Sequence, residues 1–273
     1  MGEMRTDYHV HTERGPYTVE WLENFVRTAR ERGVDELGIS EHGYRFAQTR
    51  SLFHNAWTDE RRTEDLDDYM QMFKDAKKAG LHVKFGLELD YIPGRDAEMR
   101  DFIKSYPFDY VIGSIHWIGD FGFDTPQYLA EWDNWDVKDA YQQYFEILLQ
   151  LSESKMFDFV GHADVIKVYG HEPDDAVFLQ NWYERLAKSF AANDQVVEVS
   201  TAGYRKPVNK VYPAPNFLRA CYAERVPIVL NSDAHRPEDV GADYDRAVEY
   251  IQGVGYNQIV TFSQHQRTFV TLT

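Results

Sequence analysis

The chain has 273 residues, of which 43% are hydrophobic and 27% are charged, and its formal net charge is -16. This composition is typical of a globular protein with a packed core, and the negative charge argues against nucleic acid as a partner. No apolar run reaches the ~18 residues of a membrane span and no secretory signal is recognisable, so we expect a cytoplasmic protein with no membrane partner. Cys221 is the only cysteine, which excludes an internal disulfide.

Short apolar segments alternate with longer amphipathic segments along the chain, and each kind predicts one type of element. Strands are expected in a first segment that ends at residue 11 and then at 35–40, 82–89, 109–115, 157–161, 195–200 and 227–230, with two closing strands at 258–262 and 268–272. Helices are expected at 18–32, 64–78, between 94 and 107, at 137–155, 173–193 and 215–225, and from 237 onward. A polar loop is expected at 44–62 and a long aromatic loop at 117–136, and a loop of that second length is often functional.

Seven successive strand–helix units favour an α/β fold with a mostly parallel sheet. No linker or change of composition divides the chain, so a single domain over residues 1–273 is predicted. Polar residues stand where the strands end, which favours a TIM-like (β/α) barrel over an open doubly wound sheet. The open sheet remains the alternative, although the first strand is followed by no glycine-rich dinucleotide motif.

Histidines and carboxylates gather at the predicted C-terminal ends of the strands, which meet on one face of a barrel. His9 and His11 are two residues apart and would share one face of a strand, where Asp7 could orient the first of them. Imidazoles and carboxylates without thiolates suit Zn, Mn or Fe, and the set is large enough for at least two ions. The complete set is His9, His11, Glu41, His42, Glu88, His116, His162, Asp164, Asp233 and His235.

The other four histidines stand away from this pattern. His82 begins a strand at the opposite end, and His171 and His265 lie in predicted turns. His54 lies in a polar loop that could cover the site. None of the four has a neighbour typical of a metal site, so we expect all of them outside it.

Six short motifs occur in a fixed order along nearly the whole chain. They are Asp7-Tyr8-His9-Val10-His11-Thr12, Ser40-Glu41-His42, Gly86-Leu87-Glu88-Leu89-Asp90-Tyr91, Gly113-Ser114-Ile115-His116, Gly161-His162-Ala163-Asp164 and Ser232-Asp233-Ala234-His235. As a set they resemble the motifs of the PHP (polymerase and histidinol phosphatase) family. The segment 200–207 is similar to the stand-alone histidinol-phosphatase branch, and the chain has no polymerase or nuclease domain.

The resemblance implies a distorted (β/α)7 barrel with two to three divalent transition-metal ions at the C-terminal ends of the strands. It assigns His9, His11, Glu88 and Asp233 to a first ion, Glu88, His116 and His162 to a second ion, and His42 and His235 to a third. Many relatives supply one more histidine to the third ion, and by spacing this chain has Tyr17 there. Glu13 is the candidate replacement, so we expect the third ion to be weakly held. Asp164 is expected to support the ligands from behind.

The resemblance also implies the hydrolysis of a phosphomonoester, with L-histidinol phosphate in histidine biosynthesis as the first choice. A phosphatase for another small metabolite, such as a nucleotide or sugar phosphate, is the alternative. A metal-binding regulatory protein without turnover is a third possibility, although it would predict missing ligands. The active protein is expected to be a monomer or a small homo-oligomer.

Four cations on loops at the same face are predicted to bind the substrate phosphate, which a guanidinium can grip with two hydrogen bonds. They are Lys167, Arg205, Lys206 and Arg236. Asp233 and His235 are the candidates for a catalytic proton donor to the leaving alcohol. The cationic end of histidinol phosphate would meet acidic and aromatic residues of the loop at 117–136, with Trp117, Asp120, Phe121 and Phe123 as candidates.

Overall fold

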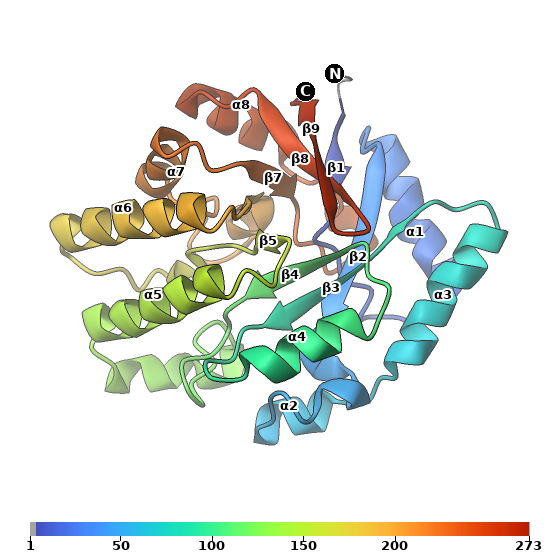
Figure 1. Ribbon diagram of the computed structural model, residues 1–273, viewed down its shortest axis with the longest axis horizontal. Helices are drawn as coiled ribbons and strands as arrows, with labels where there is room; N and C mark the ends of the chain where they lie inside the picture. Colours follow the sequence, from blue (N-terminus) through green and yellow to red (C-terminus); the bar gives the residue numbers. More distant parts are fainter. Residues whose placement is uncertain (1–3, 273) are drawn as a thin grey trace.

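Seven parallel strands form a nearly closed barrel in the computed structural model, which describes residues 4–272 (Figure 1). The strands follow one another around the barrel in chain order, each paired with the next. They are β1 (Thr6–Asp7), β2 (Glu36–His42), β3 (Lys84–Asp90), β4 (Tyr110–Ser114), β5 (Phe159–Val160), β6 (Val197–Ser200) and β7 (Ile228–Asn231). The predicted α/β class and the (β/α)7 barrel are therefore confirmed.

The barrel closes where the chain beyond β1 meets the chain beyond β7. Val10 and Ala234 form a parallel bridge. The N–H of His11 donates to the carbonyl of Ala234 at 2.7 Å, and the N–H of Ala234 donates to the carbonyl of His9 at 3.1 Å. β1 itself is shorter than the predicted segment ending at residue 11, because only two of its residues pair with β2. The bridge sets both histidines beside the residues that follow β7.

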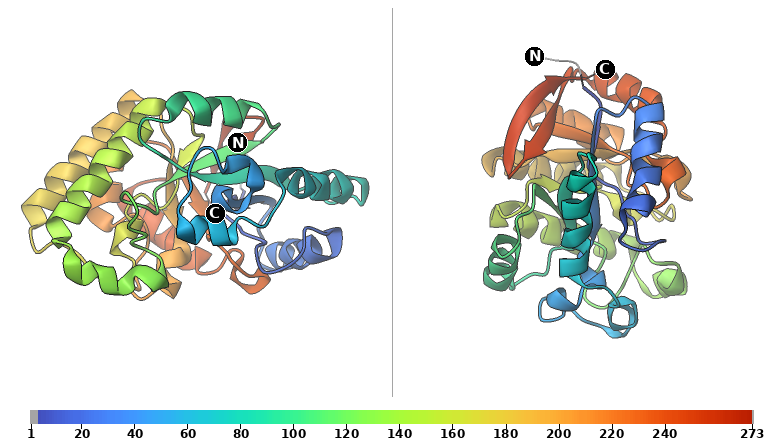
Figure 2. Two further views of the ribbon diagram at one scale, coloured as in Figure 1. Left: turned by 90° about the horizontal axis from the view of Figure 1, so that it is seen from below. Right: turned by 90° about the vertical axis from the view of Figure 1, so that its right-hand side faces the viewer.

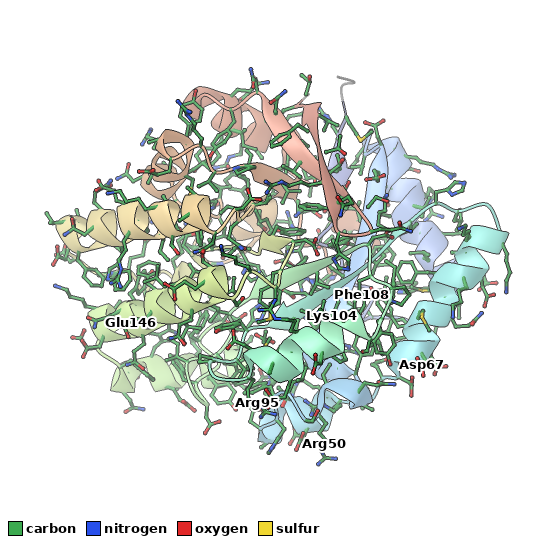
Figure 3. All side chains as sticks on the ribbon, viewed as in Figure 1. Arg50, Asp67, Arg95, Lys104, Phe108 and Glu146 are labelled. Carbon is green, nitrogen blue, oxygen red and sulfur yellow. The ribbon has the colours of Figure 1, made fainter. Side chains whose placement is uncertain are left out.

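The helices lie outside the strands, as both views of Figure 2 show. They are α1 (Val19–Glu31), α2 (Ala56–Arg61), α3 (Leu66–Lys78), α4 (Asp96–Lys104), α5 (Val137–Ser154), α6 (Ala176–Ala192), α7 (Pro215–Ala223) and α8 (Tyr244–Val254). Thr18 caps α1 by accepting the N–H of Trp21. Charged side chains such as Asp67 on α3 and Glu146 on α5 are exposed and point into solvent (Figure 3). Much of the negative charge therefore lies on the outer surface.

Two predicted loops contain helical turns. The loop at 44–62 includes α2, because Asn55 and Thr58 form a capping box that begins a helix there. The loop at 117–136 includes a 3-10 helix, Pro126–Asn134, which Trp132 anchors by donating its indole N–H to the carbonyl of Phe123. Both segments border the open end of the barrel.

The last helix begins later than predicted. Pro237 opens only a short 3-10 turn, Pro237–Asp239, and α8 starts at Tyr244. Gly241 and Asp243 between them have φ angles of +63° and +61°, which an α-helix cannot accommodate. The interruption creates the turn whose backbone N–H at Gly241 meets the carboxylate of Asp7 at 3.0 Å.

An antiparallel hairpin, β8 (Gln258–Ser263) and β9 (Gln266–Thr271), closes the N-terminal end of the barrel. Phe262 packs there with Tyr8, Tyr110 and Phe159. Tyr110 crosses the barrel and donates to the carbonyl of Tyr8 at 2.6 Å. A Cβ at Gly86 would lie 2.3 Å from its ring, so only glycine leaves room. The polar chemistry is left to the other end. Among residues 4–272, no helix is long and apolar enough to span a membrane.

Candidate metal centre and active site

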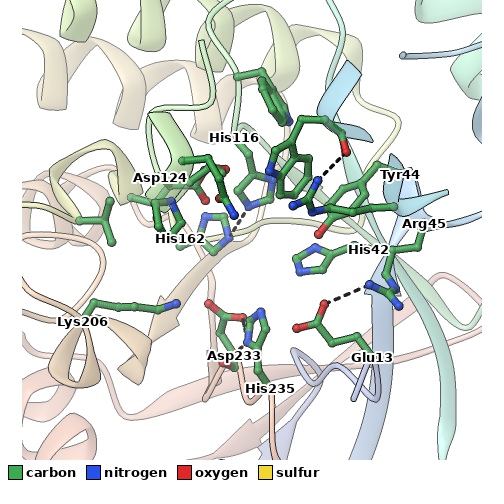
Figure 4. A pocket seen from close by; sticks show the side chains of 18 of the residues that line it. Glu13, His42, Tyr44, Arg45, His116, Asp124, His162, Lys206, Asp233 and His235 are labelled. Atoms are coloured by element: carbon green, nitrogen blue, oxygen red, sulfur yellow. Dashed lines mark hydrogen bonds and ion pairs between the residues drawn. The ribbon is translucent and has the colours of Figure 1, made fainter. Parts of the chain in front are cut away.

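A cavity of about 490 Å³ opens at the C-terminal ends of the strands (Figure 4). Its lining includes six of the residues predicted as metal ligands, which are Glu13, His42, His116, His162, Asp233 and His235. His9, His11 and Glu88 lie deeper and are 0%, 0% and 1% exposed. The structure therefore brings all nine predicted ligands to one place.

Glu88 lies at the centre of this cluster. Its Oε1 is 3.2 Å from Nε2 of His9, 3.0 Å from Nε2 of His162 and 3.5 Å from Nε2 of His116. Its Oε2 is 2.6 Å from Nδ1 of His42, which stands opposite Glu88 in the β2–β3 register. One carboxylate thus joins ligands from four strand ends, the position expected of a group shared by two ions.

The first ligand set combines Glu88 with two histidines after β1 and a carboxylate after β7. Nε2 of His9 is 3.7 Å from Oδ1 of Asp233, and Nε2 of His11 is 3.3 Å from the same oxygen. Tetrahedral Zn–N bonds of about 2.0–2.1 Å place ligand atoms about 3.4 Å apart, so the set has the right size for an ion. Within residues 4–272, Nε2 of His9 and Nε2 of His11 are buried without a hydrogen-bond partner. The donor set therefore fits a divalent cation.

The second ligand set consists of Glu88, His116 and His162. The two Nε2 atoms are 3.3 Å apart, and each faces Oε1 of Glu88. Nδ1 of His116 donates to Asp90 at 2.8 Å, which leaves Nε2 free to bind a metal. These three side chains also fit one ion.

A third group of nitrogens comes from His11, His42 and His235, whose ligand atoms lie within 4.8 Å of one another. The rings of His11 and His42 are stacked with their centroids 4.0 Å apart. Glu13 points into the cavity on the side of His42 and His235 (Figure 4). Its Oε2 lies 3.5 Å from Arg45, whose positive charge opposes a further cation nearby.

Tyr17 does not face the cavity. Its ring packs between Phe46, at 6.2 Å between centroids, and Tyr69, at 5.1 Å. Burial raises the pKa of its phenol, and the nearby carboxylate of Glu41 raises it further. A neutral, buried phenol is a poor ligand, so Glu13 remains the nearer substitute for a missing histidine.

Carboxylates around the cluster favour positive charge on the imidazoles. Burial alone would lower the pKa of His116, but Asp90 and Glu88 raise it to about 10. Burial would likewise lower the pKa of His11, and Asp233 is the first of several groups that raise it to about 9. The pKa of Glu88 lies well below its usual value, since the surrounding imidazoles outweigh its burial. A divalent cation bound among these carboxylates would supply the same positive charge.

Comparison with known proteins agrees with this geometry. A model of the PHP domain matches residues 7–202. The chain belongs to the PHP domain family. A protein of Deinococcus radiodurans named "Probable histidinol-phosphatase" is 32% identical over 259 residues, which cover 94% of this chain and 95% of that protein. The histidinol-phosphatase of Lactococcus lactis subsp. lactis is 23% identical and covers 95% of this chain and 94% of its own length.

A solved structure has the same fold as this PHP domain. It is a crystal structure of histidinol phosphate phosphatase from Lactococcus lactis subsp. lactis, complexed with zinc, L-histidinol and phosphate. The two structures agree with a TM-score of 0.76 at 23% identity, over 97% of this chain and 98% of the other. This likeness establishes the barrel architecture.

Two carboxylates behind the PHP ligands were not identified from the sequence. Glu198 on β6 accepts Nδ1–H of His9 at 2.7 Å, and Asp90 holds His116. The expectation that Asp7 orients His9 is wrong, because Asp7 accepts the N–H and hydroxyl of Ser232 at 3.0 and 2.5 Å instead. A signal for Glu198 was present, since it is a lone acid among valines in the strand predicted at 195–200.

Glu41, whose role the sequence left open, also supports the PHP ligands from behind. It accepts the N–H and hydroxyl of Thr12 at 3.0 and 3.2 Å and the N–H of His42 at 3.1 Å. Its Oε1 lies 3.6 Å from Nδ1 of His11. Glu41 therefore holds the backbone of the first motif at Thr12 and the backbone of the second motif at His42.

Of the four cations predicted to bind phosphate, Lys206 is the one that lines the cavity and reaches into it (Figure 4). Lys167 is 1% exposed, and its ammonium meets Oδ2 of Asp164 at 2.7 Å and the carbonyl of Val211 at 3.0 Å. Asp164 also accepts the N–H of Ala214 at 2.7 Å, so it supports the loop after β5. Neither Lys167 nor Ala214 is a predicted metal ligand.

Arg205 and Arg236 are directed elsewhere. Arg205 donates to the carbonyl of Ser232 at 2.5 Å and lies 3.5 Å from Asp243. It therefore braces the turn that carries Asp233. Arg236 is exposed and lies 3.9 Å from Glu238.

The aromatic loop contributes an acid that the sequence did not single out. Asp124 lines the cavity beside His116 and His162 (Figure 4), and burial raises the pKa of its carboxyl. Trp117 lines the cavity as predicted, whereas Asp120 borders a neighbouring pocket. Phe121 and Phe123 belong to the core, packed against Trp132 and Tyr144.

Arg14, Arg45 and Arg61 are further cations at the cavity that sequence reasoning missed.

The remaining histidines lie outside the metal cluster. His171 stacks on Trp132 with centroids 4.5 Å apart. His265 bonds to Asp158 at 2.9 Å at the closed end of the barrel. His54 and His82 border other pockets.

Proposed function

We propose that this PHP domain hydrolyses L-histidinol phosphate to L-histidinol and phosphate with two to three divalent ions, Zn, Mn or Fe. The observation that carries the proposal is the convergence of three overlapping ligand sets on Glu88 and its neighbours. They lie at the base of a cavity that also presents a cation, Lys206, and an acid, Asp124, to a substrate. The names of the full-length relatives support this substrate.

The residues suited to hold each ion follow from the distances. His9, His11, Glu88 and Asp233 would bind the first ion, and His116 and His162 would share Glu88 for the second. His42 and His235, with Glu13, would bind the third and weakest. Bound ions would supply the Lewis acidity that activates water and neutralises charge on the phosphoryl group.

The chain's own groups would bind and orient the substrate. Lys206 presents an ammonium for the phosphate oxygens, and Asp124 presents a carboxylate for the ammonium of histidinol phosphate. The pKa of His235 is held well below its usual value by burial first and by His11 next. Asp233 is likewise held ionised, because neighbouring imidazoles outweigh its burial. Both directions favour metal binding over the donation of a proton to the leaving alcohol.

The test is phosphate release by purified protein supplied in turn with Zn, Mn and Fe. L-histidinol phosphate is compared with a sugar phosphate and a nucleoside monophosphate. We expect kcat/KM to be highest for histidinol phosphate. Faster turnover of another monoester would assign the alternative substrate class. No turnover by the metal-loaded protein would support the hypothesis of a metal-binding regulatory protein.

Glu88→Gln tests the shared ligand directly, since an amide has nearly the same shape as the carboxylate but no charge. It should remove activity and lower metal content together, because Glu88 faces both main ligand sets. A variant that keeps full metal content and activity would contradict the shared role of Glu88.

A further inference from the structure

Glu198 connects the two main ligand sets, although it belongs to neither. It lies on β6 between β5 and β7, is 0% exposed, and receives three short hydrogen bonds. Its Oε1 accepts Nδ1–H of His9 at 2.7 Å and the amide of Asn231 at 2.8 Å. Its Oε2 accepts the backbone N–H of His162 at 2.6 Å. One carboxylate therefore fixes a ligand of the first set and a ligand of the second.

The contact with His9 decides how that imidazole is presented. Because Nδ1 carries the proton donated to Glu198, Nε2 is left as the electron-pair donor, 3.2 Å from Glu88. A hydrogen-bonded carboxylate also increases the basicity of the ring toward a metal. The contact with His162 acts through the backbone and sets the start of the loop that aims Nε2 of that residue at Glu88, 3.0 Å away.

Asn231 extends the arrangement to the first motif. Its side-chain oxygen accepts the N–H of Tyr8 at 2.8 Å, while its amide donates to Glu198. The residue before His9 and the ring of His9 are thus held by one chain of hydrogen bonds that runs through β7 and β6.

We propose that Glu198 is the positioning residue that makes the two metal sites interdependent, so that its loss weakens both ions together. The inference rests on the metal centre of the proposed function but not on the substrate. It predicts a pattern that differs from that of Asp90, which holds only His116 of the second set.

Glutamine is the sharpest substitution, because three donors converge on two oxygens. An amide has one acceptor oxygen and one NH₂ donor. If the oxygen keeps His9 and Asn231, the NH₂ faces the N–H of His162 at 2.6 Å; if it is flipped, the NH₂ faces His9 and Asn231. Either orientation places a donor against a donor at one link and leaves the other link as a weaker, uncharged hydrogen bond, so both ligand sets lose support.

The experiment is a metal titration of the apo-protein, with Zn and Mn in competition with a chromogenic chelator and no substrate present. Losing such a supporting partner typically weakens metal binding about 10–100-fold. We expect Glu198→Gln to weaken both tight ions by about that factor, and Asp90→Asn to weaken one. The Co(II)-substituted protein gives an independent readout, since the visible spectrum should change for both ions in Glu198→Gln.

Asp158→Asn is the matched control. Asp158 also accepts a backbone N–H, from Val111 at 2.7 Å, and a histidine ring nitrogen, from His265 at 2.9 Å, but at the closed end of the barrel. It should lower the melting temperature and leave both metal affinities unchanged. Should Glu198→Gln not fold, Glu198→Asp keeps the charge and withdraws the oxygens by about one C–C bond, with the same expected pattern.

The outcomes separate the two proposals. A wild-type protein that binds no tight pair of ions would overturn the proposed metal centre itself. A wild-type protein with two tight ions, alongside a Glu198 variant with unchanged affinities or with only one weakened ion, would overturn the linking role of Glu198.

Discussion

Exchanging Lys167 for methionine tests whether this residue binds phosphate or stabilises the fold. Lys167 is 1% exposed, and its ammonium meets Asp164 at 2.7 Å and the carbonyl of Val211 at 3.0 Å, above the ring of Tyr212. Lys167→Met leaves the carboxylate of Asp164 buried with a single hydrogen bond, from Ala214. Breaking a buried ion pair by removing one partner costs about 3–5 kcal/mol.

The expected shift in melting temperature follows from the size of the chain. Unfolding entropy of about 2.1 cal/mol/K per residue gives about 0.6 kcal/mol/K for 273 residues. A loss of 3–5 kcal/mol therefore lowers the midpoint by about 5–9 °C, measured by calorimetry or circular dichroism. Kinetics measured well below that midpoint should show KM for the phosphomonoester little changed.

Lys206→Met is the reciprocal variant, because Lys206 reaches into the cavity. Its melting temperature should stay near that of the wild type, whereas kcat/KM should fall about 10–100-fold through a lost charge-assisted hydrogen bond of about 1.5–3 kcal/mol. The reasoning fails if Lys167→Met keeps its melting temperature but loses kcat/KM.

The pH dependence of Lys167→Met gives a second check. Burial raises the pKa of Asp164 above its usual value, and the nearby Lys167 opposes that rise. Without Lys167 the folded-state pKa rises further, so the folded variant accepts a proton more readily than the unfolded chain. A group with a raised folded pKa loses its stabilising effect as pH increases, so the destabilisation should be smaller at pH 5 than at pH 8.

Three further outcomes are expected. Metal titration after mild chelation should reveal one loosely held ion beside a tight pair, and Glu13→Gln should loosen it further; three ions of equal affinity would contradict this. Asp124→Asn should lower kcat/KM for histidinol phosphate about tenfold or more but spare 3-(imidazol-4-yl)propyl phosphate, which lacks the ammonium; equal losses would refute a contact with that group. His265→Ala should be more destabilising at pH 5.5 than at pH 8 in thermal unfolding, because the hydrogen bond that His265 donates to Asp158 raises the pKa of its imidazole and stabilises the fold most while the imidazole is protonated.

The ligand positions could be predicted because they depend on a single regularity. Residues such as His116 and Glu88 stand where apolar strands end, and parallel strands of a barrel deliver their ends to one face. The position of a residue at a strand end does not show which other side chains it contacts. Lys167 and Lys206 both look like loop cations in the sequence, and only the fold shows that Asp164 already neutralises the first of them.

Residues behind the ligands were harder to predict for the same reason. Glu198 lies in the middle of a strand, so it breaks the strand-end pattern that identified the ligands. Its role depends on three donors at the C-terminal ends of β1, β5 and β7, which only the order of the strands brings together. The start of α8 was missed because two left-handed residues, one of them Asp243, are not readable from amphipathic periodicity.

The closure of the barrel has a consequence for the order in which this protein can mature on the ribosome. The segment with His9 and His11 is synthesised first, but the bridge to Ala234 and the ring of Phe262 that packs on Tyr8 are synthesised last. Met4 near one end of the chain donates to the carbonyl of Thr271 near the other, and Figure 1 shows both ends side by side. At about 5–20 residues per second, the first histidines wait roughly ten seconds or longer for these partners. A nascent chain stalled before residue 228 would therefore expose histidines and carboxylates with no fixed geometry, and it would capture metal ions only as loosely as an unfolded peptide does.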